Sequence, residues 1–317
     1  MPRFIIYRLL QLIPVMLLVS IFVFSFTHML PGDVIDALAG EAEAHDPARR
    51  IALEKELGLN KPIYVQYFVW LGKIVLHGDF GKSITTRRSI GVEVFKRIPA
   101  TVYLAVAAVV ISLFIAIPLG TLAAIKRRTL VDYTVTTGAV LGISIPQFWF
   151  AIMCVLVFAL YLGWLPASEY YSPFDDPWRG LQHLLLPASA LGVRLAAITT
   201  RLTRSSMLDE IRKDYVDTAR SIGLPEWRVI FKYTLRNALI PTVTVAGLQF
   251  GGLLGGTVII ETIFSWPGIG LTLYDAINSR DYPMVQASIL ILATAYVVVN
   301  LIVDITYLLL NTRIRPA

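Results

Sequence analysis

Long apolar runs recur along the whole of this 317-residue chain, and they constrain its fold more than any other feature. A helix needs about 20 apolar residues to cross the roughly 30 Å hydrocarbon core of a membrane. Apolar residues make up 56% of the chain and charged residues only 16%, whereas charged residues are about 25% of a soluble domain. The lone cysteine, Cys154, has no partner for an intrachain disulfide. We therefore predict an all-α integral membrane protein, with a single domain over residues 1–317.

Six of these runs are long enough to be membrane-spanning helices. They lie at residues 9–29, 100–125, 133–162, 184–204, 239–263 and 286–310. We interpret the first run as a retained span, because no small-residue cleavage pattern follows it. Lysine and arginine gather before the first span and after the second, fourth and sixth, which predicts that both termini are cytoplasmic. This position beside the spans also explains the net charge of +6 better than nucleic-acid binding does.

The segment between the first two spans, residues 31–99, is predicted to lie outside the membrane as a periplasmic insert. Residues 47–57 have helical spacing, and Pro62 begins a second helical pattern that ends near Gly78. The second pattern is rich in aromatic residues, which suits a helix at the membrane interface. A packed cap and a surface that receives a partner are equally compatible with this insert.

Patterns for catalysis or metal binding are incomplete. The Gly-Lys-Ser sequence at 81–83 matches the end of a phosphate-binding loop, but Gly78 is too close to serve as the first glycine of that loop. The sequence at 142–146 lacks the closing glycine of a hydrolase nucleophile motif. The four histidines have no metal-ligand spacing. We therefore predict no catalytic residue, no metal site and no cofactor in this chain.

Three ionisable residues lie inside the predicted spans, where a charge costs at least about 2.5 kcal/mol. Arg194 is near the middle of the fourth span, whereas Glu261 and Asp304 are near the ends of theirs. A position on a solute pathway is one interpretation of all three. An interhelical pair or an interfacial position is the alternative, which we favour for Glu261 and Asp304. Arg194 is the stronger candidate for the translocation pathway.

The fifth predicted span is rich in glycine. Gly251 and Gly255 belong to two overlapping pairs with one-turn spacing, in the set Gly247, Gly251, Gly252, Gly255 and Gly256. Small residues at this spacing allow another helix to approach closely in a membrane. The approaching helix belongs either to this chain or to a partner at the translocation seam, and the pattern favours neither.

Residues 214–241 form a charged stretch with helical patterning between two apolar runs. Gly223 and Pro225 divide the stretch into two short helices. Apolar residues recur at three- and four-residue spacing in both halves, namely Leu208, Ile211, Tyr215, Ala219 and Ile222, then Trp227, Ile230, Phe231, Thr234 and Ala238. Such stripes suit insertion into a groove on a partner, and they suit equally a pair of helices lying on the membrane surface.

The spacing Asp217-Thr218-Ala219-x-x-x-Gly223 resembles the Glu-Ala-Ala-x-x-x-Gly motif in the cytoplasmic loop of ABC importer permeases. Further matches resemble the permeases for dipeptides, oligopeptides and nickel, and they lie at residues 28–33, 78–81, 203–208, 214–224, 235–241, 261–270, 280–283 and 311–315. The resemblance therefore covers nearly the whole chain. Asp217, Thr218 and the Leu-Arg pair at 235–236 depart from the general motif, but the peptide-type subgroup tolerates all three departures.

This resemblance implies a type I importer permease fold with six transmembrane helices and a cytoplasmic coupling loop at residues 205–238. It implies contact with an ATPase through Tyr215, Asp217, Thr218, Ala219, Ile222, Gly223 and Leu224. The implied partners are a second permease subunit, two cytosolic ATPases that hold ATP and Mg²⁺, an external solute-binding protein and membrane lipid. The implied location is the bacterial inner membrane.

Short peptides are the cargo that the resemblance favours, followed by glutathione and then nickel. Arg194, Gly251, Gly255 and Glu261 are the candidate residues of the pathway or its gate. Two functions of other classes remain open, an ATPase-independent solute pore and a membrane scaffold. A pore would transport solute without partners in liposomes, whereas a scaffold would bind an ATPase without any solute flux.

Overall fold

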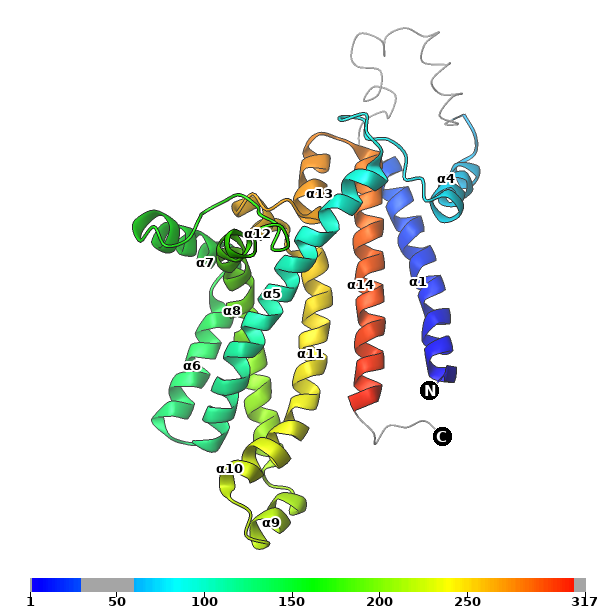
Figure 1. Ribbon diagram of the computed structural model, residues 1–317. Coiled ribbons are helices and arrows are strands. Elements are labelled where there is room, and N and C mark those ends of the chain that lie inside the picture. Colours follow the sequence, from blue (N-terminus) through cyan, green and yellow to red (C-terminus); the bar gives the residue numbers. More distant parts are fainter. Residues whose placement is uncertain (1, 30–59, 311–317) are drawn as a thin grey trace.

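The computed structural model describes residues 2–29 and 60–310 of the chain. These residues are mainly helical, and no β-sheet forms among them, because their one β-bridge is an isolated pair between Lys82 and Ser89. The longest helices run side by side, and shorter helices lie at both ends of the molecule (Figure 1). The helix predicted at residues 47–57 lies outside the described residues.

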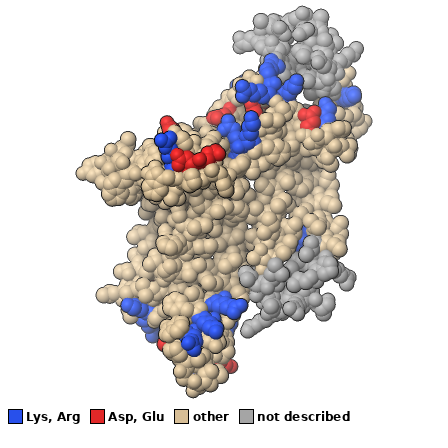
Figure 2. Space-filling model, viewed as in Figure 1, with Lys and Arg blue, Asp and Glu red and all other residues tan. Residues whose placement is uncertain are grey.

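The two ends of the molecule carry different short helices. The upper end in Figure 1 carries α4 (Ile63–His77) and α13 (Ile269–Asn278), and the lower end carries α9 (Asp214–Ser221) and α10 (Glu226–Arg228). On the face shown in Figure 2, charged side chains gather at these two ends, with a broad band of other residues between them. Such a band matches a chain whose middle lies in hydrocarbon.

Five helices in the described part are each long and apolar enough to cross a membrane, and a bent pair brings the number to six. The five are α1 (Pro2–Met29), α5 (Ile90–Ile125), α8 (Pro177–Glu210), the helix from α10 through α11 (Leu235–Gly256), and α14 (Tyr282–Leu310). The predicted fold class is thereby confirmed, with several helix ends displaced. The fifth prediction ran to residue 263, whereas α11 ends at Gly256 and a separate short helix, α12 (Val258–Ile263), follows it.

The third predicted span is the sixth of these elements, and its prediction as one continuous helix was wrong. Helix α6 (Leu130–Ser144) is followed by α7 (Gln147–Cys154), which continues as a π-helix, η1 (Val155–Tyr161), and the two halves meet at 100°. Ile145 adopts an extended conformation before Pro146. Proline disfavours a helical conformation in the preceding residue and has no N–H to continue the helix.

Helix α8 lies at the centre of the bundle, against α5, α6 and α11. It approaches α5 closely because small residues meet at the crossing. A Cβ at Gly192 of α8 would lie 2.8 Å from the carbonyl oxygen of Ala108, and a Cβ at Gly120 of α5 would lie 2.7 Å from the Cβ of Thr203. In a membrane, close packing of this kind replaces the hydrophobic drive that operates in water. The main buried cluster contains residues of both helices and extends to Ile260 of α12 and to Phe264 and Trp266 after it.

Helices α1 and α14 pack together beside this bundle. Arg8 of α1 and Asp304 of α14 form an ion pair at 3.0 Å, so the expected interhelical pairing of Asp304 is confirmed. Helix α4 joins α1 at the upper end, where the Tyr67 hydroxyl lies 2.8 Å from Ser20 Oγ. The prediction that α4 ends near Gly78 is also confirmed, because Gly78 has φ of +63° and terminates the helix.

Candidate coupling site and pathway residues

The turn between α9 and α10 is a helix end closed by glycine. Gly223 has φ of +82°, its N–H donates to the Arg220 carbonyl at 2.9 Å, and the Leu224 N–H donates to the Ala219 carbonyl at 3.3 Å. This pair of hydrogen bonds, with glycine in the left-handed conformation, is the Schellman motif. The predicted break into two short helices is therefore confirmed. We call residues 222–227, which connect α9 to α10 and begin α10, the tip.

A small apolar core of its own supports the tip. Val216, Ala219 and Val229 are buried, and Tyr215 and Leu224 pack against them. The predicted stripe of α9 was wrong in one member, Ile222, which is exposed, and it omitted Val216, which is fully buried. Helix α9 ends at Ser221, so Ile222 belongs to the turn and does not continue the face that Tyr215 and Ala219 share.

Polar contacts attach α9 to the long helices on either side. The Tyr215 hydroxyl donates to Glu210 Oε2 of α8 at 2.7 Å and accepts from Asn237 Nδ2 of α11 at 3.1 Å. The Arg220 guanidinium donates to Glu226 Oε1 across the turn at 2.8 Å and to Asp217 Oδ1 within α9 at 3.4 Å. The hydrogen bond that Arg220 donates to the Glu226 carboxylate raises the pKa of Arg220 above its usual value. The Tyr215 contacts tie α9 to both α8 and α11.

Apolar side chains on the other face of this loop are exposed. Ile222 is 70% exposed, Trp227 61% and Phe231 57%, and the Arg228 guanidinium lies 5.3 Å from the Trp227 ring centre. The members of the predicted second stripe therefore divide between two faces of the helix. Ile230, Thr234 and Ala238 are buried, whereas Trp227 and Phe231 are exposed. Exposed aromatic residues beside an arginine are typical of protein interfaces.

The seven predicted coupling residues fall into two groups. Asp217, Thr218, Ile222 and Gly223 are exposed at the lower end, whereas Tyr215, Ala219 and Leu224 are partly or wholly enclosed by the core of the loop. The first group is accessible from outside the chain, and the second group belongs to the apolar core that supports the turn. Sequence reasoning placed Trp227 and Phe231 in the loop but did not select them as contact residues. Their spacing of four within a helix indicates a shared face.

Glu261, predicted as a pathway or gate residue, is fully buried beneath the loop that joins α12 to α13. Its carboxylate accepts hydrogen bonds from the Leu271 N–H at 2.7 Å, from Thr257 Oγ1 at 2.8 Å and from Thr101 Oγ1 at 3.2 Å. A Cβ at Gly268 would lie 2.2 Å from Glu261 Oε1, so the loop fits closely around the carboxylate. In this conformation Glu261 fastens the loop and faces no open surface.

The two selected glycines of α11 have different surroundings. A Cβ at Gly251 would lie 3.2 Å from Asn300 Oδ1 of α14, so this glycine accommodates a helix of the same chain. Gly255 is exposed and has no atom within 4 Å of its Cβ position. Of the two interpretations that the pattern left open, intrachain packing describes Gly251. Gly255 stays a candidate for contact with a partner helix.

Arg194 is exposed close to the middle of α8. Its side chain has no hydrogen bond or ion pair with any described residue. An arginine at this depth costs at least about 2.5 kcal/mol if lipid surrounds it. The exposed face of α8 is therefore unsuited to lipid, and a partner subunit or an aqueous pathway suits it better.

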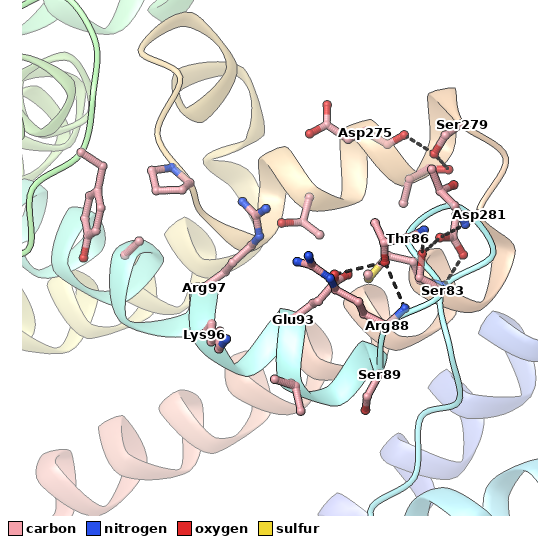
Figure 3. Close-up of a pocket in the computed structure, with 18 residues that line it drawn as sticks. Ser83, Thr86, Arg88, Ser89, Glu93, Lys96, Arg97, Asp275, Ser279 and Asp281 are labelled. Carbon is pink, nitrogen blue, oxygen red and sulfur yellow. Dashed lines mark hydrogen bonds between the residues drawn. The ribbon is translucent and has the colours of Figure 1, made fainter.

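An outer cleft of about 790 Å³ lies at the upper end, between the start of α5 and α13. Arg97, Lys96 and Glu93 extend from α5 on one side, and Asp275 lies on α13 opposite them (Figure 3). Asp281, which precedes α14, accepts a hydrogen bond from Ser83 and closes one end of the cleft. Sequence reasoning did not select these residues, because they are separated by about 180 positions and form no local motif.

Comparison with known proteins decides the family. The family model described as "Binding-protein-dependent transport system inner membrane component" matches residues 116–316, and the corresponding N-terminal model matches residues 1–105. The chain belongs to this family. It is therefore a multi-pass membrane component of an ABC importer family, as the motifs of its loop indicated.

Curated relatives match over nearly the full chain. A dipeptide transport system permease of Alkalihalophilus pseudofirmus is 41% identical, with 97% of this chain and 98% of the relative covered. A di/tripeptide transport system permease of Pseudomonas aeruginosa is 42% identical, with 99% of each covered. A glutathione transport system permease of Escherichia coli K12 is 40% identical, also with 99% of each covered.

Proposed function

We propose that this chain is one of two membrane subunits of an ATP-driven importer that passes short peptides from an external solute-binding protein into the cytoplasm. Two of the relatives are described as permeases for dipeptides or tripeptides, and a third as a permease for glutathione, which is itself a short peptide. Nickel is the weaker alternative. The exposed guanidinium of Arg194 repels a divalent cation, whereas it attracts the carboxylate of a peptide.

In this function the lower end faces the cytoplasm, and both termini lie on that side of a bacterial inner membrane. Basic residues support this orientation, because Lys126, Arg127 and Arg128 follow α5 and Arg212 and Lys213 follow α8 at the lower end. ATP and Mg²⁺ are bound by two cytosolic ATPase subunits, and this chain supplies the contact surface rather than the catalytic groups. A second, homologous permease completes the pathway.

The observation that carries the proposal is the exposed apolar surface at the tip, on a loop fixed to two long helices. Ile222 and Trp227 present this surface, and Phe231 extends it just beyond the tip. Tyr215 connects α9 to α8 and α11. Closure of the ATPase dimer around nucleotide moves the tip, and the Tyr215 contacts pass the movement to the spans. The ATPases shift the spans between conformations only as far as they bind the tip differently in each conformation.

The outer cleft suits the arrival of solute at the opposite end. Its lining carries both signs of charge, with Arg97 and Lys96 beside Glu93 and Asp275. Mixed charge of this kind supports specific docking of a soluble partner through electrostatic complementarity. We therefore assign the upper end to contact with the external solute-binding protein.

Reconstitution tests this function. Both permeases, both ATPases and the binding protein are placed in proteoliposomes, and uptake of a radiolabelled dipeptide is measured with and without ATP. The proposal predicts ATP-dependent uptake by the full complex and none by this chain alone. Uptake by the chain alone would indicate a pore, and ATPase binding without uptake by the full complex would indicate a scaffold.

A further inference from the structure

Arg194 and Gln147 line the same small pocket beside the bend of α6 and α7. The rest of its lining is apolar or small, and comprises Gly142, Ile145 and Phe150 near the bend and Ala190 and Val193 of α8. The Gln147 amide, like the Arg194 guanidinium, makes no hydrogen bond with any residue in the described ranges. Two neighbouring groups with strong hydrogen-bond donors are therefore available to a ligand from outside the chain.

The bend explains how a cation is held at this depth. Helix α6 ends at Ser144, and Ile145 beside that end lines the same pocket as Arg194. The carboxyl end of a helix carries partial negative charge, which favours a nearby cation. This field reduces the cost of keeping the guanidinium near the middle of α8 while no ligand is bound. The five N–H donors of the guanidinium stay available for hydrogen bonds to a ligand.

A groove continues from this pocket along α6 and α8. It has a volume of about 340 Å³ and shares Gly142 and Val193 with the pocket of Arg194. Its lining is uncharged, with Ile115 and Leu119 from α5, Gly138 and Ala139 from α6, and Ala196, Ala197 and Thr200 from α8 among its residues. The volume lies within the range of roughly 300–1,000 Å³ that is typical of small-molecule sites.

We infer that Arg194 and Gln147 bind the free carboxylate of the transported solute, while the rest of the solute lies in this groove. The planar guanidinium donates two parallel hydrogen bonds to a carboxylate, and the Gln147 amide donates a third. These bonds gain strength in surroundings of low dielectric constant. An uncharged groove accepts different side chains with little preference. The inference rests on the proposed function, because it assigns a role in the passage of peptides.

The test uses the complex of both permeases and both ATPases in lipid nanodiscs. The binding protein is left out, so that any preference between the two probes comes from the membrane subunits. The probes are the dipeptide Ala-Phe and its C-terminal amide, and equilibrium dialysis measures the affinity of each. We expect the wild-type complex to bind the free acid at least about tenfold more tightly than the amide, because hydrogen bonds to a charged group are stronger than those to a neutral one.

Substitutions locate this preference. Arg194→Gln removes it, and Arg194→Lys keeps part of it, because lysine retains the charge without the planar pair of donors. The matched control is Arg201→Gln, an exposed arginine two turns further along α8, which keeps the full preference. In the groove, Gly138 has no atom within 4 Å of its Cβ position, so Gly138→Phe fills open space. It weakens binding of both probes without changing their ratio.

Three results would contradict the inference. The wild-type complex binds the two probes equally or binds neither, Arg201→Gln removes the preference as Arg194→Gln does, or Arg194→Gln weakens both probes to the same extent. The last result would indicate that Arg194 pairs with an acidic residue of the second permease. Failure of the proposed function is seen separately, as absence of ATP-driven peptide uptake by the complete wild-type importer.

Discussion

At the upper end of the molecule, the loop between α12 and α13 covers a buried polar group. At the lower end, apolar side chains of the tip are exposed. Glu261 is fully buried and accepts three hydrogen bonds from residues near it in space. Ile222, by contrast, is 70% exposed. The polar groups of the upper loop are hydrogen-bonded within the chain, whereas the tip has exposed apolar surface. We therefore expect the lower end to act through a partner, whereas the loop at the upper end is held by contacts within the chain.

The largest effect that we expect is at Gly268. The backbone there has φ of −89°, which any residue adopts, so the effect of Gly268→Ala is purely steric. Its Cβ would lie 2.2 Å from Glu261 Oε1, and the carboxylate cannot move away without leaving its three donors unpaired. We expect a loss of about 3 kcal/mol in stability, measured by thermal unfolding in detergent. Gly255→Ala is the control and should leave the midpoint unchanged. Equal midpoints for both variants would contradict this account of the upper loop.

A substitution at Asp132 tests whether part of the lower end is also stabilised by contacts within the chain. Its carboxylate binds Arg204 of α8 through Nε at 2.5 Å and Nη2 at 2.7 Å, and so joins α6 to α8. Asp132→Asn leaves the partly buried guanidinium without its counter-charge. We expect a loss of about 2 kcal/mol in stability, below the full cost of breaking a buried pair because Arg204 is partly exposed. Asp217→Asn removes only an exposed ion pair, and a loss as large as that of Asp132→Asn would contradict the distinction.

Gly223→Val should separate coupling from stability. Valine in the left-handed conformation costs about 1–2 kcal/mol, which corresponds to a roughly 5- to 30-fold change in the population of this turn. No atom lies within 4 Å of the Cβ position, so the spans are not disturbed. We expect unchanged thermal unfolding and a loss of about tenfold in peptide taken up per ATP hydrolysed. Gly223→Asn should retain most of the coupling, since asparagine tolerates this conformation. A normal uptake ratio for Gly223→Val would remove the tip from the coupling role.

The smallest effect is expected at a single contact residue. Ile222→Ser removes exposed apolar area, so it should leave unfolding unchanged while weakening the affinity for the ATPase by about fivefold, or about 1 kcal/mol. Surface plasmon resonance on permease nanodiscs measures this affinity. Leu130→Ser is the control, because Leu130 is also strongly exposed but begins α6 rather than the tip. The contact would be ruled out if both variants bound the ATPase as the wild type does.

Sequence patterns predicted those features that depend on residues close together in the chain. The apolar runs predicted the six spans, and glycine followed by proline predicted the turn at Gly223. The bend at Pro146 was missed, although a proline within an apolar run was a signal for it. The role of Glu261 was beyond local patterns, because one of its donors, Thr101, is 160 positions away. The exposed position of Ile222 was missed because α9 ends at Ser221, one residue before Ile222, so the helical spacing no longer applies there.

Site-specific photocross-linking tests the central claim, contact between the tip and an ATPase, most directly. A photoreactive phenylalanine analogue replaces Ile222 or Trp227 in the reconstituted complex, and replaces Leu130 in the control. We predict that the ATPase subunit cross-links to positions 222 and 227, in a yield that changes when nucleotide is added, and does not cross-link to position 130. Cross-links from the tip to lipid alone, with or without nucleotide, would show that this loop lies on the membrane surface and would contradict the proposed coupling.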